Sequence, residues 1–268
     1  MTAALIITLR ETLEAALVVG IILAYLEKSG NLKHKKHIWY AVLAGVLVSV
    51  IAAFVLKAIG QEFEGTAEQI YEGVTMLLAS GLLTWMILWM LTKRKNLKSN
   101  IENKVAAHIQ DNHPMGLFFL TFVSVIREGI ETSIFMQAAS FENQGQNLLL
   151  GGILGIVLAI ILSYILFKGI KKIQLKKFFT VTSVLLILFA AGLLAHGIHE
   201  FQEAGVIPII TEHIWDTNGF IDEKGGFGGI LSGLFGYNGN PSLIETISYF
   251  AYLIVIALTW RAIEKKQI

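Results

Sequence analysis

Long apolar stretches constrain this chain more than any other feature. Seven segments each hold about 20 mainly apolar residues, the length that a helix needs to cross the hydrocarbon core of a membrane. Only 15% of the 268 residues are charged, whereas soluble domains carry about 25%. We therefore predict an all-α integral membrane protein with seven transmembrane helices. The segments are 3–26, 38–59, 69–91, 115–139, 147–167, 179–201 and 244–263.

The composition also excludes several classes of protein. A chain with 54% hydrophobic residues is neither disordered nor a nucleic-acid-binding domain, so membrane lipid is an expected partner and nucleic acid is not. The chain has no cysteine, which excludes disulfides, zinc–thiolate sites and iron–sulfur clusters. The first span begins near Met1 without a basic segment or a cleavage site, so we expect a retained helix in a multi-pass protein of the cytoplasmic (plasma) membrane.

Basic residues predict the orientation, because lysine and arginine in short loops accumulate on the cytoplasmic side. They cluster after the first, third, fifth and seventh spans, while the alternate loops hold only Lys57 and Lys224. We therefore predict that the N-terminus lies outside and the C-terminus inside. The external loops are acidic, which is either ordinary solvated charge or a surface that concentrates cations.

A repeated motif indicates an internal duplication. The first and fourth spans contain Arg10–Glu14 and Arg127–Glu131, which both read R-E-x-x-E. Weaker matches pair Gly45 with Gly155 and Gly81 with Gly192. Because three spans separate the copies, the second enters the membrane from the opposite side, as in many secondary transporters. We predict one transmembrane domain built as a 3+3 inverted repeat plus one helix: repeat one 1–92, repeat two 114–204, an external glycine-rich loop 205–243 and a seventh helix 244–264.

The two motifs place six charged residues inside the membrane. A charged group there costs roughly 2.5–3.5 kcal/mol, so six unpaired groups would cost on the order of 15–20 kcal/mol. Residues at i and i+3 share a helix face, so the glutamates of each motif project together and can meet those of the other copy. Oxygen ligands suit a hard cation, with ferric iron the hardest candidate and calcium, magnesium or manganese also conceivable. The alternative is a pair of structural salt bridges. The candidate ligands are Glu11, Glu14, Glu128 and Glu131, with Arg10 and Arg127 beside them.

Further acidic and histidine residues lie at helical spacing at the outer ends of the third and sixth spans. Each set shares one helix face, so we expect a path for cations toward the central site, although hydrogen-bonded histidines without a ligand role are an open alternative. The two sets are Glu64, Glu68 and Glu72, and His196, His199, Glu200 and Glu203.

The duplicated motif resembles the oxidase-dependent ferric iron permease family, and most closely its bacterial EfeU-type branch. The resemblance covers nearly the whole chain. Its other elements are Tyr71–Gly73, Ala190–Leu193, Glu203–Gly205, Gly233–Tyr237 and Pro241–Ser242.

This resemblance implies inward transport of ferric iron, with ferrous iron left open, and no permanently bound cofactor. It implies external partners: a haem peroxidase or other oxidase, and an iron-binding lipoprotein or periplasmic protein. By the same resemblance the four motif glutamates are metal ligands, and Glu72, Glu203 and Asp216 match acidic positions outside the motif. His199 and Glu200 join this set as candidates from their spacing.

We expect iron to pass from the outer acidic residues to the motif glutamates, and then inward as one repeat rocks against the other. Three alternatives stay open. The same carboxylates can serve another cation, such as a divalent metal or protons. A membrane metalloenzyme would need a reactive motif, and His199–Glu203 lacks the second histidine of H-E-x-x-H. A purely structural subunit would tolerate loss of a motif glutamate.

Overall fold

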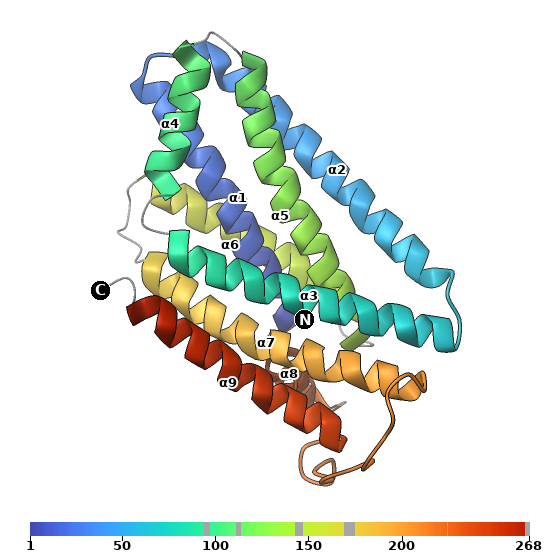
Figure 1. Cartoon of the computed structure of the whole chain (residues 1–268). Helices are drawn as coiled ribbons and strands as arrows, with labels where there is room; N and C mark the ends of the chain where they lie inside the picture. The colour runs from blue at the N-terminus through green and yellow to red at the C-terminus, as the bar shows by residue number, and fades with distance from the viewer. Residues whose placement is uncertain (94–96, 111–113, 143–146, 169–174, 224, 266–268) are drawn as a thin grey trace.

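The chain is all-helical over the residues described by the computed structural model, which are 1–93, 97–110, 114–142, 147–168, 175–223 and 225–265 (Figure 1). Each of the seven apolar segments forms one long helix. These helices are α1 (Thr2–Lys28), α2 (Lys35–Gln61), α3 (Thr66–Lys93), α5 (Pro114–Glu142), α6 (Leu148–Phe167), α7 (Leu175–Glu203) and α9 (Leu243–Lys265). Shorter elements are the 3-10 helix Leu32–His34, α4 (Leu97–Gln110) and α8 (Gly226–Phe235).

Five of the described helices, α2, α3, α6, α7 and α9, are long and apolar enough to cross a membrane. Helices α1 and α5, with 27 and 29 residues, are also long enough to cross a membrane, but the motif charges interrupt their apolar sequence. Large apolar side chains are exposed on several helices, including Phe54 (70%), Leu149 (81%) and Leu258 (60%). Soluble proteins rarely expose such surfaces, so these faces contact lipid and the chain is a multi-pass membrane protein.

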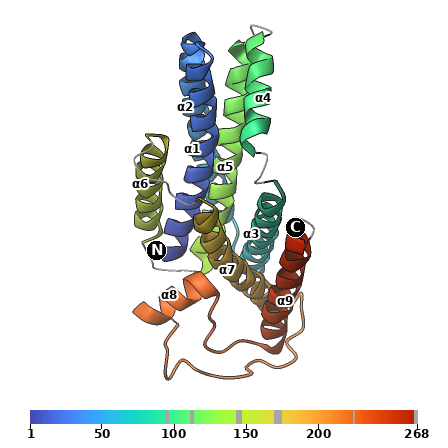
Figure 2. The same cartoon turned by 90° about the vertical axis from the view of Figure 1, so that its left-hand side faces the viewer.

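Helices α1 and α5 cross the centre of the molecule in opposite senses and contact each other (Figures 1 and 2). Helix α1 packs mainly against α6, and α5 packs mainly against α2. Helix α3 packs against α7, and α9 packs mainly against α7 with a smaller contact to α3. Exchanging the first three long helices for the next three leaves the pairs α1–α6, α2–α5 and α3–α7 unchanged.

Glycines allow the helices of the pairs α1–α6 and α2–α5 to approach closely. A Cβ on Gly155 of α6 would overlap Thr8 of α1, and a Cβ on Gly45 of α2 would overlap Val125 of α5. Thr8 and Val125 each lie two residues before a motif arginine. The Thr8 hydroxyl also donates to the carbonyl oxygen of Gly152 (3.0 Å), so small residues bring backbones together here as in other membrane helix pairs.

Helix α4 was not predicted, because the sequence there is short and polar. It is amphipathic, and it buries Ile101 and Val105 against Ile22 and Leu26 of α1 and Leu117 of α5. Lys98 and Lys104, which belong to α4, therefore lie on a helix that is packed against the rest of the molecule.

The loop 205–243, which the sequence predicts to be external, is folded in its described part. The Thr217 amide donates to the Gly239 carbonyl (2.8 Å), and the Tyr237 hydroxyl donates to the Ile221 carbonyl (3.1 Å). Helix α8 within the loop packs against α7. These bonds and contacts hold the described part of the loop in a defined fold.

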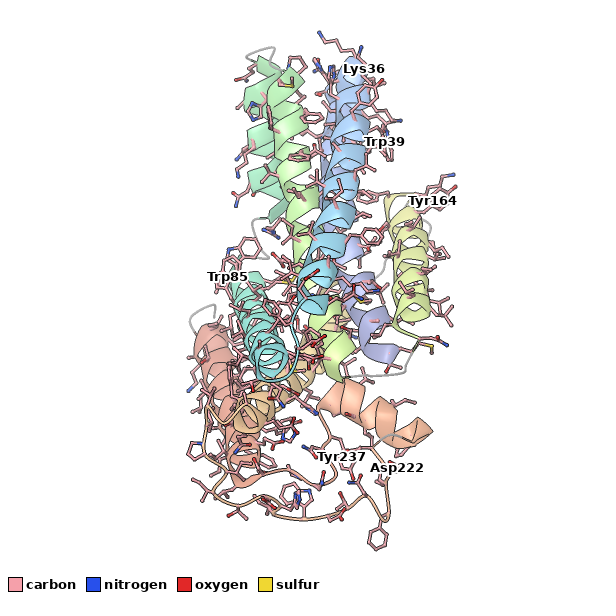
Figure 3. All side chains as sticks on the ribbon, turned by 90° about the vertical axis from the view of Figure 1, so that its right-hand side faces the viewer. Lys36, Trp39, Trp85, Tyr164, Asp222 and Tyr237 are labelled. Atoms are coloured by element: carbon pink, nitrogen blue, oxygen red, sulfur yellow. The ribbon has the colours of Figure 1, made fainter. Side chains whose placement is uncertain are left out.

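The molecule has a basic end and an opposite end formed by this loop. Figure 3 shows Lys36 and Trp39 at one end, and Asp222 and Tyr237 at the other. The orientation in the membrane stays a prediction. Some basic residues that it uses lie outside the described residues, namely Arg94, Lys95, Lys171, Lys172, Lys224 and Lys266.

Candidate metal site

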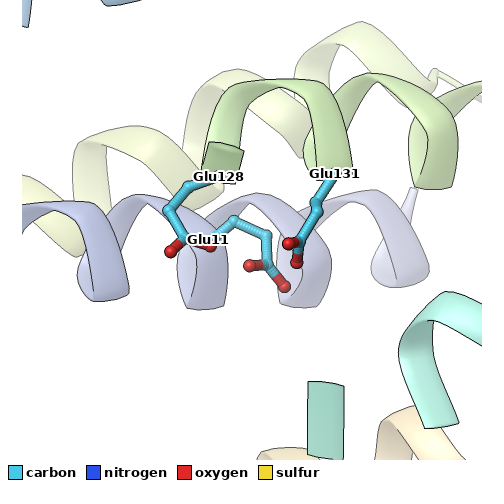
Figure 4. A group of neighbouring side chains, drawn as sticks. All are labelled: Glu11, Glu128 and Glu131. Carbon is cyan, nitrogen blue, oxygen red and sulfur yellow. The ribbon is translucent and has the colours of Figure 1, made fainter. Parts of the chain in front are cut away.

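Three glutamates from the two motifs converge at the contact between α1 and α5 (Figure 4). One carboxylate oxygen from each of Glu11, Glu128 and Glu131 lies within 4.8 Å of the others. All three residues are buried, with Glu11 fully enclosed. The motif spacing explains this arrangement, since Glu128 and Glu131 share one face of α5 and Glu11 faces them from α1.

Several oxygens in this group are without a hydrogen-bond partner among the described residues. They are both oxygens of Glu11 and the Oε2 atoms of Glu128 and Glu131. Burying an ionised carboxylate without a partner is strongly unfavourable. The group therefore has the composition of a cation site, with unused oxygen ligands directed into one buried volume.

Glu14, the fourth predicted ligand, is bound by an arginine. Its Oε1 accepts from Arg10 Nε at 2.9 Å. Arg10 is completely buried, and its second contact is with the sulfur of Met90 (3.7 Å). Glu14 therefore lies beside the three converging glutamates with one oxygen already occupied.

Arg127 pairs with the other motif but is less enclosed than Arg10. It donates to Glu128 Oε1, and its Nε lies 3.5 Å from Glu131 Oε1. Its side chain is 43% exposed and lies over the ring of Trp89, with 5.4 Å from Cζ to the ring centroid. Since Arg127 uses one oxygen of each glutamate, it leaves the Oε2 atoms for another ligand.

The charges of the two motifs do not cancel. Four glutamates against two arginines leave two negative charges, which a divalent cation would neutralise. Carboxylate oxygens are the ligands of hard cations such as magnesium, calcium and manganese, and also of ferric iron.

A cavity of about 740 Å³, the vestibule, extends from these glutamates along α1 toward the basic end of the chain. Glu14, Glu128 and Arg127 line one end, and Lys28, Lys98 and Lys104 line the other. Glu14 and Lys28 are 14 residues apart, so the vestibule runs about 21 Å along the helix at 1.5 Å per residue.

The predicted outer residues form a separate group at the ends of α3 and α7. Glu72 and Glu200 are half-buried, whereas Glu203 is exposed. Glu203 Oε2 accepts from Gln69 (3.1 Å), and its Oε1 lies 3.2 Å from His199. Among the described residues, the hydrogen bonds and ion pairs of this group do not reach the buried glutamates of the motifs.

Asp216 lies further out, in the loop between α7 and α8. It is exposed, and its Oδ1 accepts from the backbone amide of Asn218 (3.0 Å). The structure does not bring Asp216 together with the other predicted ligands.

Sequence reasoning missed Glu245, which is 2% exposed. It lies 3.1 Å from His199 Nδ1 and accepts from Asn238 (2.9 Å) and from the Ser242 amide (3.1 Å). The Glu245 amide in turn donates to the Ser242 hydroxyl (3.3 Å). This is a capping box at the start of α9, and the S-x-x-E spacing before an apolar run was its sequence signal.

Comparisons with known proteins agree with this arrangement. Residues 1–265 match the model of the iron permease FTR1 family. The chain is 34% identical to "Ferrous iron permease EfeU" of Escherichia coli O157:H7 over 252 residues, which cover 93% of this chain and 91% of the relative. It is 33% identical to the protein of the same name from Yersinia pestis, covering 93% and 89%. No solved structure matches the chain.

These relatives match the chain over nearly its whole length, and a family model covers both motifs. The buried glutamates, the membrane helices and the match point to the same conclusion. The chain belongs to the FTR1 family of iron permeases.

Proposed function

We propose that this chain moves iron inward across the plasma membrane through the buried glutamates of the two R-E-x-x-E motifs. The observation that carries the proposal is the convergence of Glu11, Glu128 and Glu131 with unpartnered buried oxygens. A structural salt bridge would use these oxygens, whereas a site for a transient cation leaves them available.

We also propose the 3+3 inverted repeat with seven spans, N-terminus outside and C-terminus inside. Its support is the pairing of α1 with α6 and of α5 with α2, which the repeat would make equivalent. The contacts of Gly155 and Gly45 support it at residue level, because each faces the position two residues before a motif arginine.

The charge balance favours Fe²⁺ as the ion in the site, because two uncompensated negative charges match a divalent cation. The names of the relatives, which specify ferrous iron, support the same ion. Ferric iron, expected from the sequence resemblance, is the second candidate, since an all-carboxylate site suits a harder ion. It would leave one excess positive charge unless another anion joined the site.

An external oxidase, such as a haem peroxidase, and an iron-binding lipoprotein or periplasmic protein stay part of the proposal from resemblance. The outer group of Glu72, Glu200, Glu203 and His199 is the proposed place where iron arrives. The acidic side chains there lie at the predicted outer ends of α3 and α7.

We propose no enzymatic activity for the chain. The string His199–Glu203 was the nearest approach to a metalloenzyme motif. In the structure His199 contacts Glu203 and Glu245, which supports a role in joining α7 to α9.

Uptake by the purified protein in liposomes tests the function. We expect uptake of Fe²⁺ held reduced by ascorbate, with slower uptake of ferric citrate and of Mn²⁺. Glu11→Gln and Glu131→Gln should each abolish it. The matched control is Glu27→Gln, on the exposed inner end of α1, which should transport normally.

Each result has a distinct meaning. Faster Mn²⁺ than Fe²⁺ uptake would replace iron by another divalent metal as the substrate. Faster uptake of ferric than of ferrous iron would identify ferric iron as the substrate, as expected from the resemblance. Normal transport in both motif variants would refute a role of these glutamates in ion passage.

A further inference from the structure

The vestibule is larger than an ion path requires. One water occupies about 30 Å³ in the liquid, so an ion with six waters needs roughly 200 Å³. The vestibule has a volume of about 740 Å³, within the range of about 300–1,000 Å³ that is typical of small-molecule sites. Its walls are mostly apolar, with a few polar groups at each end, as in such sites.

The charge at the lysine end of the vestibule opposes the passage of a free cation. Among the described residues, Lys28, Lys98 and Lys104 line that end with one acidic residue, Glu102, whose carboxylate lies 3.9 Å from the Lys98 amine. Two positive charges therefore remain. They repel a departing metal ion and attract an anion entering from solution.

These lysines are held in place by the fold. Lysines that only set the orientation of a membrane protein can lie in solvated loops. Lys98 and Lys104 instead belong to helix α4. Ile101 and Val105 anchor this helix in a buried cluster with α1 and α5, so the helix forms one wall of the vestibule. The side chain of Lys98 is 76% exposed and is accessible to a solute.

We propose that the lysine end of the vestibule binds a small, soluble, multivalent oxyanion, such as a polycarboxylate or a phosphate compound. The metal ion leaves Glu14 and Glu128 at the other end, crosses the vestibule, which is about 21 Å long, and binds the oxygens of this anion. These oxygens replace the glutamate oxygens on the ion, and no electron is transferred in this exchange. Anion binding stands on the cavity and its lysines, while the acceptor role rests on the proposed transport function.

Binding is tested without iron, on the full chain in nanodiscs of neutral phosphatidylcholine. Citrate is the probe, and isothermal titration calorimetry is the measurement. Citrate should bind the unmodified chain and the Glu14→Gln variant. Its affinity should fall about tenfold in the double variant Lys98→Gln/Lys104→Gln, because two charge-assisted contacts are lost. The control, Lys33→Gln/Lys265→Gln, removes two exposed lysines that do not line the vestibule and should bind normally.

The acceptor role is tested by uptake into liposomes that contain either citrate or neutral bipyridine. Internal citrate should speed iron uptake by the unmodified chain and lose this effect in Lys98→Gln/Lys104→Gln. Internal bipyridine, which needs no lysine, should support uptake by both. Failure of all uptake would refute the transport function, and the citrate titration would still decide anion binding.

Three results would overturn the anion site. One is absence of citrate binding to the unmodified chain, and another is equal binding to the double variant. The third is loss of citrate binding when the nanodisc contains anionic phosphatidylglycerol, which would assign the lysines to lipid headgroups. If inorganic phosphate competes with citrate and phosphatidylglycerol does not, the result supports a site for a soluble anion.

Discussion

Arg127 lies over the ring of Trp89 while it donates a hydrogen bond to Glu128, so one guanidinium joins the carboxylates of the candidate metal site to the wall of the vestibule. Arg10, at the same place in the first motif, is sealed in the core with Glu14 and Met90. The two copies of the motif therefore hold their arginines differently. Arg127 has room to move away from the glutamates, and Arg10 does not.

The Trp89→Leu variant should bind Fe²⁺ about two- to fivefold more weakly, since an exposed cation–π contact is worth about 0.5–1 kcal/mol. When a metal takes Glu128 and Glu131 from Arg127, the ring still stabilises the guanidinium; without the ring, Arg127 should compete more strongly with the metal for these carboxylates. Anaerobic titration calorimetry measures the affinity. Trp89→Phe keeps a ring and should stay close to the unmodified chain; tighter binding in Trp89→Leu would contradict this role.

The arginines should also differ in their effect on stability. Arg10→Met leaves Glu14 buried and unpaired, so we expect a loss of about 3–5 kcal/mol. Arg127→Met should destabilise less, because that side chain is 43% exposed. Thermal unfolding in detergent measures both. The double variant Arg10→Met/Glu14→Met removes both charges and should recover most of the loss, and no recovery would show that Arg10 stabilises through other contacts.

Glu11→Gln should stabilise the metal-free protein and abolish its response to metal. Both oxygens of Glu11 are buried without a partner among the described residues, so removing the charge relieves an unfavourable burial. Metal at 100 times its dissociation constant should stabilise the unmodified chain by about 2.7 kcal/mol, and the variant much less. Thermal unfolding with and without Mn²⁺ or Fe²⁺ measures this. A metal-free variant that melts earlier would mean that Glu11 has a partner in the folded chain.

Glycine substitutions test the close helix contacts. A Cβ on Gly155 would overlap both Thr8 and the backbone of Leu5, so Gly155→Ala should destabilise by about 1–3 kcal/mol. At Gly45 the nearest atoms are Cγ1 and Cβ of Val125, at 2.8 and 2.9 Å, so the overlap is smaller and Gly45→Ala should cost less. Gly81 has open space around its Cβ position and is the matched control.

Gly81→Ala should be neutral or slightly stabilising, because alanine favours a helix over glycine by up to about 1 kcal/mol. The thermal midpoints in detergent should rank Gly81→Ala above Gly45→Ala and Gly45→Ala above Gly155→Ala. A reversed order would contradict the close packing of α6 on α1.

The seven long helices were predictable because length and apolarity decide what a membrane accepts. Helix α4 was not, since its stability comes from Ile101 and Val105 packing on distant helices and not from its own hydropathy. The motif spacing identified the buried glutamates. It did not specify that Glu14 turns to Arg10 while Glu11 stays unpaired, because that choice depends on side-chain rotamers in the assembled core. Glu245 was missed although its S-x-x-E pattern was visible.

The opposite directions of α1 and α5 give the buried carboxylates an order. Glu14 and Glu128 border the vestibule. Glu11 precedes Glu14 by three residues and Glu131 follows Glu128 by three, so each lies about 4.5 Å further from the vestibule along its helix. In the proposed inward transport, an ion leaves Glu11, whose oxygens have no hydrogen-bond partner among the described residues, and reaches Glu14, whose Oε1 is bound by Arg10. We therefore expect the ion to be bound less tightly beside Glu14 than beside Glu11, so that affinity falls along the direction of the proposed transport.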